Sequence, residues 1–249
     1  MTNLAICLQV CPKDVWLGLR LTKLICSIER EKRKDIEFIV SARRDTNMPA
    51  VDEIIKTAQG RFSTVKFIKG KRFGVGWPNG CNDLWQETMM RVYMMVNSKH
   101  IQSDGVLTFE ADCLPLRPDW LDRLAEEWML TKLASKMVCG HAHSWPEVEA
   151  PTHINGNAIF ATDTTDKYPV LNGCDAKSGW DAFHGALLLS IGRDTPMIFQ
   201  KYRIKNATLD EVKAIRKQGE IPALFHGIKG DTGLTAVESM IRDGSFYDR

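Results

Sequence analysis

Two carboxylates stand two residues apart at the end of a short apolar run. Residues 106–109 are β-branched or aromatic enough to predict a buried strand, and Glu110 and Asp112 follow this run. Alternate residues of an extended segment point the same way, so the two carboxylates can converge on one point. Such a pair suits a hard divalent cation, which binds through one or two carboxylates plus substrate phosphates. The alternative is structural, with Asp112 capping a turn before Pro115 and Glu110 pairing with an arginine.

The residues after this pair extend the motif. An apolar-Pro step follows, and then Arg-Pro-Asp-Trp-Leu at residues 117–121 begins a helix. The whole segment resembles the acidic motif of glycosyltransferases with the GT-A fold, which holds Mn²⁺ or Mg²⁺ against the diphosphate of a nucleotide-sugar donor. The resemblance implies Asp112 and Glu110 as metal ligands. Glu110 stands where many members have Asp, which leaves open whether it contacts the metal or the sugar.

Two later segments resemble the acceptor side of the same family. Residues 153–161 resemble the segment that lines the junction of donor sugar and acceptor, which implies Asn155 and Asn157 as contacts to sugar hydroxyls. The alternative is a turn built on Asn-Gly. Inverting members carry an acidic general base near the position of Asp181, and Trp180 beside it would offer a stacking surface. The alternative for Asp181 is a helix N-cap.

The C-terminal part of the chain contains a partial match to a third family motif. An apolar run leads into His226-Gly-Ile-Lys229, which resembles an element in which histidine completes the metal shell and lysine meets the diphosphate. The longer family motif continues Lys-Pro-Trp, whereas this chain continues Gly230-Asp231. His226 as a core residue is the alternative. This element resembles retaining families, whereas Asp181 as base implies inversion, so the stereochemistry stays open.

The elements that must position these residues alternate along the chain. Apolar runs predict strands, and apolar residues at helical spacing predict helices. The predicted strands are residues 3–10, 36–40, 64–68, 106–109 and 137–140, with another ending at 161, and the predicted helices are 15–29, 51–58, 120–130 and 208–217. Asp83 is expected to cap a further helix. This order predicts an α/β fold with a mainly parallel central sheet flanked by helices, and the resemblance implies a single GT-A-like, Rossmann-like domain.

Two loops are candidates for donor contacts. In GT-A enzymes the loops after the first two strands hold the nucleotide, so the resemblance implies roles for Arg43, Arg44 and Asp45. Residues 69–80 are glycine-rich and basic, but they lack the Gly-Lys-Ser/Thr ending of a nucleoside-triphosphate loop and the third glycine of a dinucleotide fingerprint. A flexible backbone with Lys71 and Arg72 would suit a loop close to phosphates. A plain surface loop is the alternative.

Composition limits the class of protein. The seven cysteines form no CxxC pair, which argues against a secreted disulfide framework and favours the cytoplasm. No signal peptide is apparent, and no apolar stretch approaches the ~20 residues of a membrane span, so we expect a soluble protein with no membrane partner. The length of 249 residues favours one domain over 1–249. We expect residues 1–112 to bind the nucleotide sugar, and 113–249 to bind the acceptor and complete the metal site.

The histidines of residues 141 and 143 are a separate possibility. Alternate histidines on an extended segment share a face, and His141, His143 and Cys139 could together hold zinc. No second group of ligands follows at the usual spacing.

The predicted function is therefore transfer of a sugar from a nucleotide-sugar donor to an acceptor hydroxyl. A nucleotidyltransferase with the same sheet is one alternative, although it would have a glycine-rich loop after the first strand, where residues 9–13 contain no glycine. A non-catalytic sugar- or nucleic-acid-binding module is the other, and it would not need converging carboxylates.

DNA carrying a hydroxylated base is one predicted acceptor. Five basic residues and no acidic one lie between residues 61 and 81, and a second basic group follows at Lys201, Arg203 and Lys205. Such groups could track a phosphate backbone while Phe73 and Trp77 stack on an extruded base. Against this, the formal net charge is only +2, which neither demands nor excludes a polyanion.

Overall fold

A seven-stranded sheet forms the centre of the computed structural model, which describes residues 4–145, 150–174, 177–205, 208–217 and 221–248. The strand order is β10-β6-β9-β4-β1-β2-β3. Parallel pairing joins β1 to β2 and β4, β2 to β3, and β6 to β10, whereas β9 runs antiparallel to β4 and β6. The strands are β1 (Leu4–Val10), β2 (Arg33–Ala42), β3 (Phe62–Lys69), β4 (Gly105–Glu110), β6 (Val138–Gly140), β9 (Ala158–Ala161) and β10 (Gly192–Asp194).

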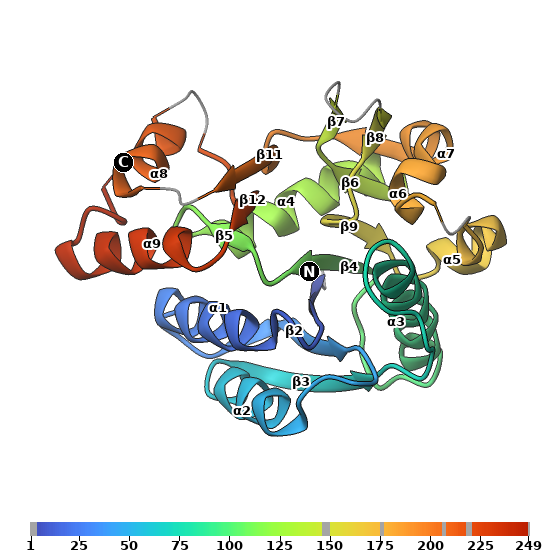
Figure 1. Ribbon diagram of the computed structural model, residues 1–249, viewed down its shortest axis with the longest axis horizontal. Helices are drawn as coiled ribbons and strands as arrows, with labels where there is room; N and C mark the ends of the chain where they lie inside the picture. Colours follow the sequence, from blue (N-terminus) through green and yellow to red (C-terminus); the bar gives the residue numbers. More distant parts are fainter. Residues whose placement is uncertain (1–3, 146–149, 175–176, 206–207, 218–220, 249) are drawn as a thin grey trace.

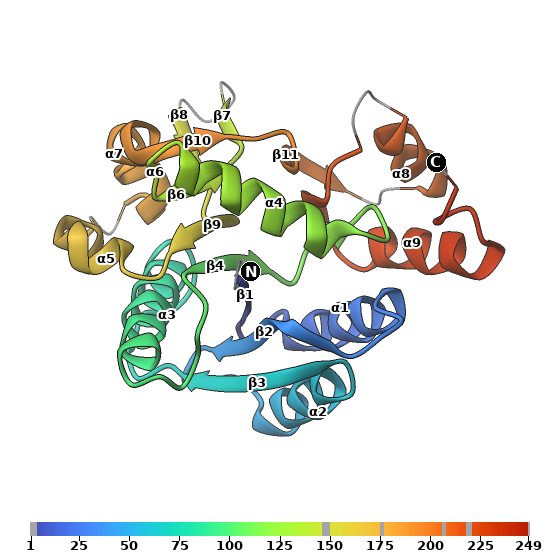
Figure 2. The same ribbon diagram turned by 180° about the vertical axis from the view of Figure 1, so that it is seen from behind.

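Helices cover both faces of this sheet, because alternate side chains of the buried strands point to opposite faces. In β1, Leu4, Ile6 and Leu8 belong to one core cluster, and Ala5 and Cys7 belong to a second. The first cluster lies under α1 (Val15–Ile28), α2 (Met48–Gln59) and α4 (Trp120–Leu133). The second lies under α3 (Asn79–Asn97), α6 (Trp180–Phe183) and α7 (Gly185–Ile191). Figures 1 and 2 show α1 and α2 side by side, with α3 beyond the opposite side of the sheet.

A three-stranded sheet extends the fold on the side that contains the C-terminus (Figure 1). Its order is β11-β12-β5, and β5 is antiparallel to β12. A short hairpin pairs β7 with β8. The remaining elements are β5 (Cys113–Pro115), β7 (Ala142–Trp145), β8 (Ala150–Ile154), α5 (Thr164–Lys167), η2 (Pro169–Asn172), β11 (Ile198–Lys205), α8 (Leu209–Arg216), β12 (Leu224–Lys229) and α9 (Thr232–Asp243).

The predicted α/β fold with a mainly parallel, helix-flanked sheet is confirmed. The helix predicted at 208–217 is α8, and it begins with a capping box, in which the side chain of Thr208 accepts from the N–H of Glu211 and the side chain of Glu211 accepts from the N–H of Thr208. The predicted cap at Asp83 is wrong. Helix α3 begins at Asn79, so Asp83 lies inside it, and its Oδ2 accepts the backbone N–H of Gly74 at 2.8 Å.

The carboxyl ends of the parallel strands meet at one edge of the sheet, where the loops after β1, β2, β3 and β4 emerge. This is the edge at which open α/β sheets bind ligands. Within the described residues, no helix is long and apolar enough to span a membrane.

Candidate metal centre and active site

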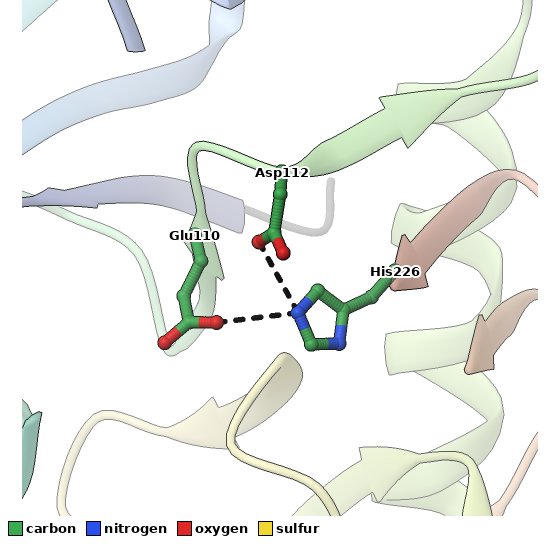
Figure 3. A group of neighbouring side chains, drawn as sticks. All are labelled: Glu110, Asp112 and His226. Atoms are coloured by element: carbon green, nitrogen blue, oxygen red, sulfur yellow. Dashed lines mark ion pairs between the residues drawn. The ribbon is translucent and has the colours of Figure 1, made fainter. Parts of the chain in front are cut away.

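Glu110, Asp112 and His226 converge at this edge. The Nε2 atom of His226 lies 3.2 Å from Oε2 of Glu110 and 3.2 Å from Oδ1 of Asp112. Figure 3 shows the imidazole pointing its Nε2 between the two carboxylates, with Nδ1 turned away from both. Among the described residues, this is the one group of three or more potential ligands whose atoms all lie within 4.8 Å of one another. The structure thus brings together all three predicted metal ligands.

Local backbone structure explains the convergence. Glu110 ends β4, and Asp112 lies in the two-residue turn before β5. Strand β5 pairs with β12 so that Cys113 is opposite His226, which brings the histidine next to Asp112. The glycine after His226 has a backbone φ of +122°, and a Cβ there would lie 2.0 Å from the carbonyl oxygen of Lys201. Gly227 is therefore required for the close approach of β11 to β12.

The charges of the cluster determine the protonation of His226. Burial by itself lowers the pKa of this imidazole, but the neighbouring charges of Asp112 and Glu110 outweigh burial and raise the pKa to about 9. Without a metal ion, His226 is therefore a cation held between two carboxylates at neutral pH. The Glu110 side chain is 43% exposed and that of Asp112 only 9%, so Glu110 is the more accessible to a ligand.

The donor set fits a divalent ion. Ligands at ~2.1 Å on adjacent corners of an octahedron lie about 3 Å apart, close to the 3.2 Å separations of Nε2 from the two carboxylate oxygens. Within the described part of the chain, neither Nδ1 nor Nε2 of the buried His226 has a hydrogen-bond partner of acceptable geometry. Nε2 lies between the two carboxylates, so it is the nitrogen that a metal ion there could take as a ligand once the imidazole has lost its proton. The two carboxylates are ligand types that suit Mn²⁺ or Mg²⁺, and the imidazole favours Mn²⁺ over the harder Mg²⁺.

A hydrogen-bond network connects Asp181 to the cluster of Glu110, Asp112 and His226. Oδ2 of Asp181 accepts from the N–H of Gly156 at 2.9 Å and from Nδ2 of Asn155 at 3.2 Å. Oδ1 of Asn155 accepts from both the N–H and Nδ2 of Asn157. The side-chain Oδ1 of Asn157 then accepts the N–H of Glu110 at 2.8 Å. Asn155 and Asn157 are 8% and 4% exposed, so their predicted contacts to sugar hydroxyls stay predictions while their structural role is visible.

The predicted stacking surface at Trp180 is wrong. This indole is 4% exposed and stacks on Trp85 with ring centroids 3.4 Å apart. A Cβ at residue 156 would lie 3.1 Å from the indole, a tight contact that would require the ring to shift by a few tenths of an ångström. Trp180 therefore packs the segment that carries Asp181 instead of facing a ligand.

The zinc hypothesis for His141, His143 and Cys139 is wrong for the described residues, since these three do not group as ligands. The two imidazoles do lie on one side of the segment, with centroids 5.8 Å apart, but Cys139 lies in β6 near the guanidinium of Arg193. Burial is the main cause that lowers the pKa of His143 to about 4, so this imidazole is neutral.

The predicted donor residues lie at the same edge of the sheet. Arg43 and Asp45, just after β2, form a two-pronged ion pair with distances of 2.7 and 2.8 Å. Lys71 is exposed, whereas Arg72 contacts Asp83 at 3.3 Å and Oε1 of Gln86 at 2.6 Å. The backbone of Lys229 ends β12, and its side chain lies outside the described residues.

The sequence did not indicate two further residues that lie close to the candidate site, one beside the two carboxylates and one beside Asp181. Asp14 lies near enough to Glu110 and Asp112 for their charges to add to burial, the main cause, in raising its pKa. His153 is 1% exposed, and its Nε2 lies 4.0 Å from Oδ2 of Asp181. The position of Asp14 just after the first strand could have indicated that it lies at the ligand-binding edge of the sheet. Nothing in the sequence indicates that His153 lies next to Asp181.

Comparison with known proteins shows the fold. No protein-family model matches the sequence, and no curated protein sequence matches it. Solved glycosyltransferase structures do match it in three dimensions. Mouse xyloside xylosyltransferase 1 in its apo form aligns with a TM-score of 0.53 at 8% identity over 90% of this chain and 97% of its own. The mannosyltransferase PcManGT of Pyrobaculum calidifontis, solved with GDP-Man and Mn²⁺, aligns with a TM-score of 0.51 at 14% identity over 78% of this chain.

The bifunctional glycosyltransferase WbbM in its apo form also aligns, with a TM-score of 0.52 at 10% identity over the whole chain. This chain spans 52% of the WbbM chain and 55% of the PcManGT chain, so about half of each. At these identities the likeness concerns the fold, which is that of glycosyltransferase domains.

Proposed function

We propose that this protein is a metal-dependent glycosyltransferase that moves a sugar from a nucleotide-sugar donor to an acceptor hydroxyl. The observation that carries the proposal is the convergence of Glu110, Asp112 and His226 from β4, the following turn and β12. A fold shared with glycosyltransferases, one of them solved with GDP-Man and Mn²⁺, supports the same class of reaction. A bound divalent ion would neutralise charge that develops on the departing nucleoside diphosphate.

The donor would lie across the edge formed by the first half of the chain, residues 1–112. Arg43 and Asp45 would contact the nucleotide, and Lys71 and Arg72 would approach its phosphates. Lys229, at the end of β12, would meet the diphosphate from the other side. Asn155 and Asn157 would contact the sugar directly or hold the segment that does. Residues 113–249 would then complete the metal site and bind the acceptor.

Transfer forms a bond between the acceptor oxygen and the anomeric carbon and breaks the bond from that carbon to the diphosphate. The acceptor proton would pass to Asp181 as general base, and the nucleoside diphosphate would leave with the electron pair of the broken bond. A carboxylate has about four acceptor positions. Three are used by Asn155, Gly156 and the N–H of Ala182, which leaves Asp181 capacity for one more hydrogen bond. This role corresponds to inversion at the anomeric carbon.

The acceptor we propose is nucleic acid with a hydroxylated base. Support comes from basic residues at the site edge, but fewer than the sequence suggested. Arg61 precedes β3 at the opposite end of that strand, where its Nε donates to the carbonyl of Cys26. Lys69 and Lys71 are exposed at the carboxyl end of β3, where the candidate site lies, and Lys201 is exposed on β11. The side chains of Arg203 and Lys205 lie outside the described residues.

Binding of nucleoside diphosphates and nucleotide sugars, measured by calorimetry with and without Mn²⁺, tests the proposal. Wild-type protein should bind at least one of them in a metal-dependent way. Asp112→Asn keeps the side-chain shape and removes one metal-binding charge, so this affinity should fall by at least ~10-fold, or ~1.4 kcal/mol. Asp52→Asn, on the exposed side of α2, is the matched control and should leave binding unchanged.

Two results would contradict the proposal. One is the absence of metal-dependent binding across a panel of uridine, guanosine, cytidine, thymidine and adenosine diphosphate sugars. The other is unchanged Mn²⁺-dependent affinity in Asp112→Asn, which would remove the three-residue cluster from donor binding.

A further inference from the structure

The loop at residues 70–78 exposes three large apolar side chains beside the candidate site. Phe73, Val75 and Trp77 are 76%, 69% and 73% exposed, and they alternate with Gly74 and Gly76. The loop follows β3 at the edge where the metal cluster lies. Three side chains this strongly exposed within five residues distinguish this loop from the other exposed apolar residues of the described chain, and clustered apolar surface marks interaction sites.

We propose that this 70–78 loop is a stacking surface for the bases of the nucleic-acid acceptor, with Trp77 and Phe73 as the contacting rings. The inference rests on the proposed function, in which a nucleic acid brings a base hydroxyl to the metal site. An enzyme that modifies a base must take the base out of its stack, and exposed aromatic rings replace part of the lost stacking.

The protein holds the backbone of this loop from beneath. Oε2 of Glu87, a residue only 4% exposed, accepts the N–H groups of Lys71 and Arg72 at 2.7 and 3.2 Å. Oδ2 of Asp83 accepts the N–H of Gly74 at 2.8 Å. Helix α3 therefore presents the loop through hydrogen bonds to its backbone, while the apolar side chains stay outside.

Gly74 and Gly76 are both needed for the shape of the loop. A Cβ at position 74 would lie 2.5 Å from Oδ2 of Asp83 and 2.6 Å from the carbonyl oxygen of Asn79. Gly76 has a φ of +68°, which disfavours other residues, and no atom lies within 4 Å of the point where a Cβ would stand. The result is an open surface around Trp77 that a planar ring can approach.

Positive charge accompanies the apolar side chains. The guanidinium of Arg44 lies over the ring of Phe73 at 3.9 Å from its centroid, a cation–π contact. Lys69 and Lys71 are exposed, and within the described residues neither they nor Arg44 has an ion-pair partner. Aromatic faces next to exposed cations are the two features that single-stranded nucleic acids bind.

The distribution of charge favours a nucleic acid over a lipid surface. Lys69 ends β3, the edge strand of the large sheet, and Lys71 follows it, whereas Lys201 is exposed on β11 of the small sheet. In Figure 1, β3 and β11 lie on opposite sides of β4, the strand that leads to the metal cluster. An extended polyanion can cross the site and meet both groups, whereas a membrane would press on the apolar loop alone.

Oligonucleotide binding by the purified protein tests the inference. Fluorescence anisotropy would measure a labelled single-stranded 20-mer and the matching duplex at low salt. Trp77→Ala should weaken single-strand binding by about 5- to 100-fold, the effect of losing one stacked base, and Trp77→Phe should retain most of it. Leu133→Ala removes an equally exposed apolar side chain from the end of α4, and it should change nothing.

A salt series adds an independent measurement. Lys69→Ala should flatten the slope of log K against log salt by roughly 0.7 to 0.9, the value for one lost phosphate contact. Lys32→Ala removes an exposed cation just before β2, at the opposite edge of the sheet, and should leave the slope unchanged.

The outcomes separate this inference from the proposed function. Metal-dependent donor binding by Trp77→Ala should equal that of wild type, because Trp77 has no assigned donor role. Oligonucleotide binding that is absent, or that survives Trp77→Ala and Phe73→Ala together, overturns the stacking surface and leaves the transferase intact. Trp77-dependent binding to vesicles of 30% phosphatidylserine without binding to oligonucleotides overturns it in favour of a membrane. If the wild-type protein shows no metal-dependent donor binding, the proposed function itself is overturned.

Discussion

At the scale of single residues, His226 shows what a sequence can and cannot indicate. The His-Gly-x-Lys pattern nominated this residue, and the structure places it against Asp112 and Glu110. The sequence does not indicate the protonation state of this imidazole. Its pKa of about 9 depends on the carboxylates of Asp112 and Glu110, which only the fold brings within 3.2 Å. An ordinary histidine would lose its proton near pH 6.5.

The raised pKa of His226 predicts the pH dependence of metal binding. Coordination requires the neutral imidazole, so Mn²⁺ must displace a proton at any pH below about 9. Apparent Mn²⁺ affinity should therefore rise about tenfold per pH unit from pH 6.5 to 8.5. Calorimetry at pH 7.5 in two buffers of different ionisation enthalpy should count about one proton released per ion bound.

The matched variant for this experiment is His226→Gln, which should bind Mn²⁺ more weakly and release no proton. In the metal-free protein the free energy of unfolding should fall as the pH rises, whereas Mn²⁺ affinity rises with pH. A folded-state pKa above the unfolded value contributes stability that is complete below pH 6.5 and is lost as pH rises through about 9. A proton count that is the same in wild type and His226→Gln would exclude His226 as a ligand.

At the scale of elements, the segment between β8 and β9 depends on Asp181. This carboxylate accepts the N–H of Gly156 and the side chain of Asn155, and the same oxygen lies 4.0 Å from Nε2 of His153. Since Asn157 in turn accepts the N–H of Glu110, a change at Asp181 can reach the candidate metal ligand Glu110 through the backbone. Asp181 has two candidate roles, proton acceptor and support for this segment.

Asp181→Asn separates these roles. If Asp181 is the base, turnover should fall by ~10²–10⁴-fold while metal-dependent donor affinity stays within about twofold of wild type. Single-turnover transfer assays and calorimetry measure the two quantities. Asp166→Asn, on α5, is a control carboxylate with no role in the site. Equal losses of turnover and donor affinity, together with a lower melting temperature, would assign Asp181 to support alone.

The elements differ in how far their sequences predicted them. The β–α alternation of the first half was predictable, because long buried strands such as β1 and amphipathic helices such as α1 have clear periodicities. The start of α3 was not, because Asp83 looked like an N-cap while it actually binds the loop before the helix. The burial of Trp180 depends on contact with Trp85, which lies 95 positions earlier in the chain, and local pattern carries no such information.

The same limit explains what was found of the site. Glu110 and Asp112 were predictable because two residues of separation and one strand end bring them together. They meet His226 only because β5 pairs with β12, which is a contact between segments far apart in the sequence. Local sequence pattern does not predict this contact, and only the resemblance to a family suggested it. The small sheet and α9 escaped prediction for the same reason.

At the scale of the whole molecule, Arg20 fastens the C-terminal helix to the first half. Its guanidinium donates to Glu238, Asp231 and Thr235, which links α1 to α9. Arg20→Met should lower the free energy of unfolding by about 1 kcal/mol, because the network is partly exposed to solvent. The melting temperature should fall by about 2–4 °C, and less at high salt.

Lys23→Met is the control for this prediction. Lys23 lies on the same helix and forms a single exposed ion pair with Glu53, so its loss should shift the melting temperature little. Equal shifts in the two variants would show that the Arg20 network adds nothing beyond an ordinary surface pair.

Because β5 pairs with β12, the cluster of Glu110, Asp112 and His226 can form only late in synthesis of the chain on the ribosome. Glu110 and Asp112 are synthesised long before His226, so during elongation the two carboxylates have neither the imidazolium nor the strand that will carry it. The first strands and helices can collapse meanwhile, since β1 to β4 pair among themselves. Nascent chains arrested before residue 224 should therefore contain a folded first half that does not bind Mn²⁺, and Mn²⁺ binding is expected only once β12 has left the ribosome.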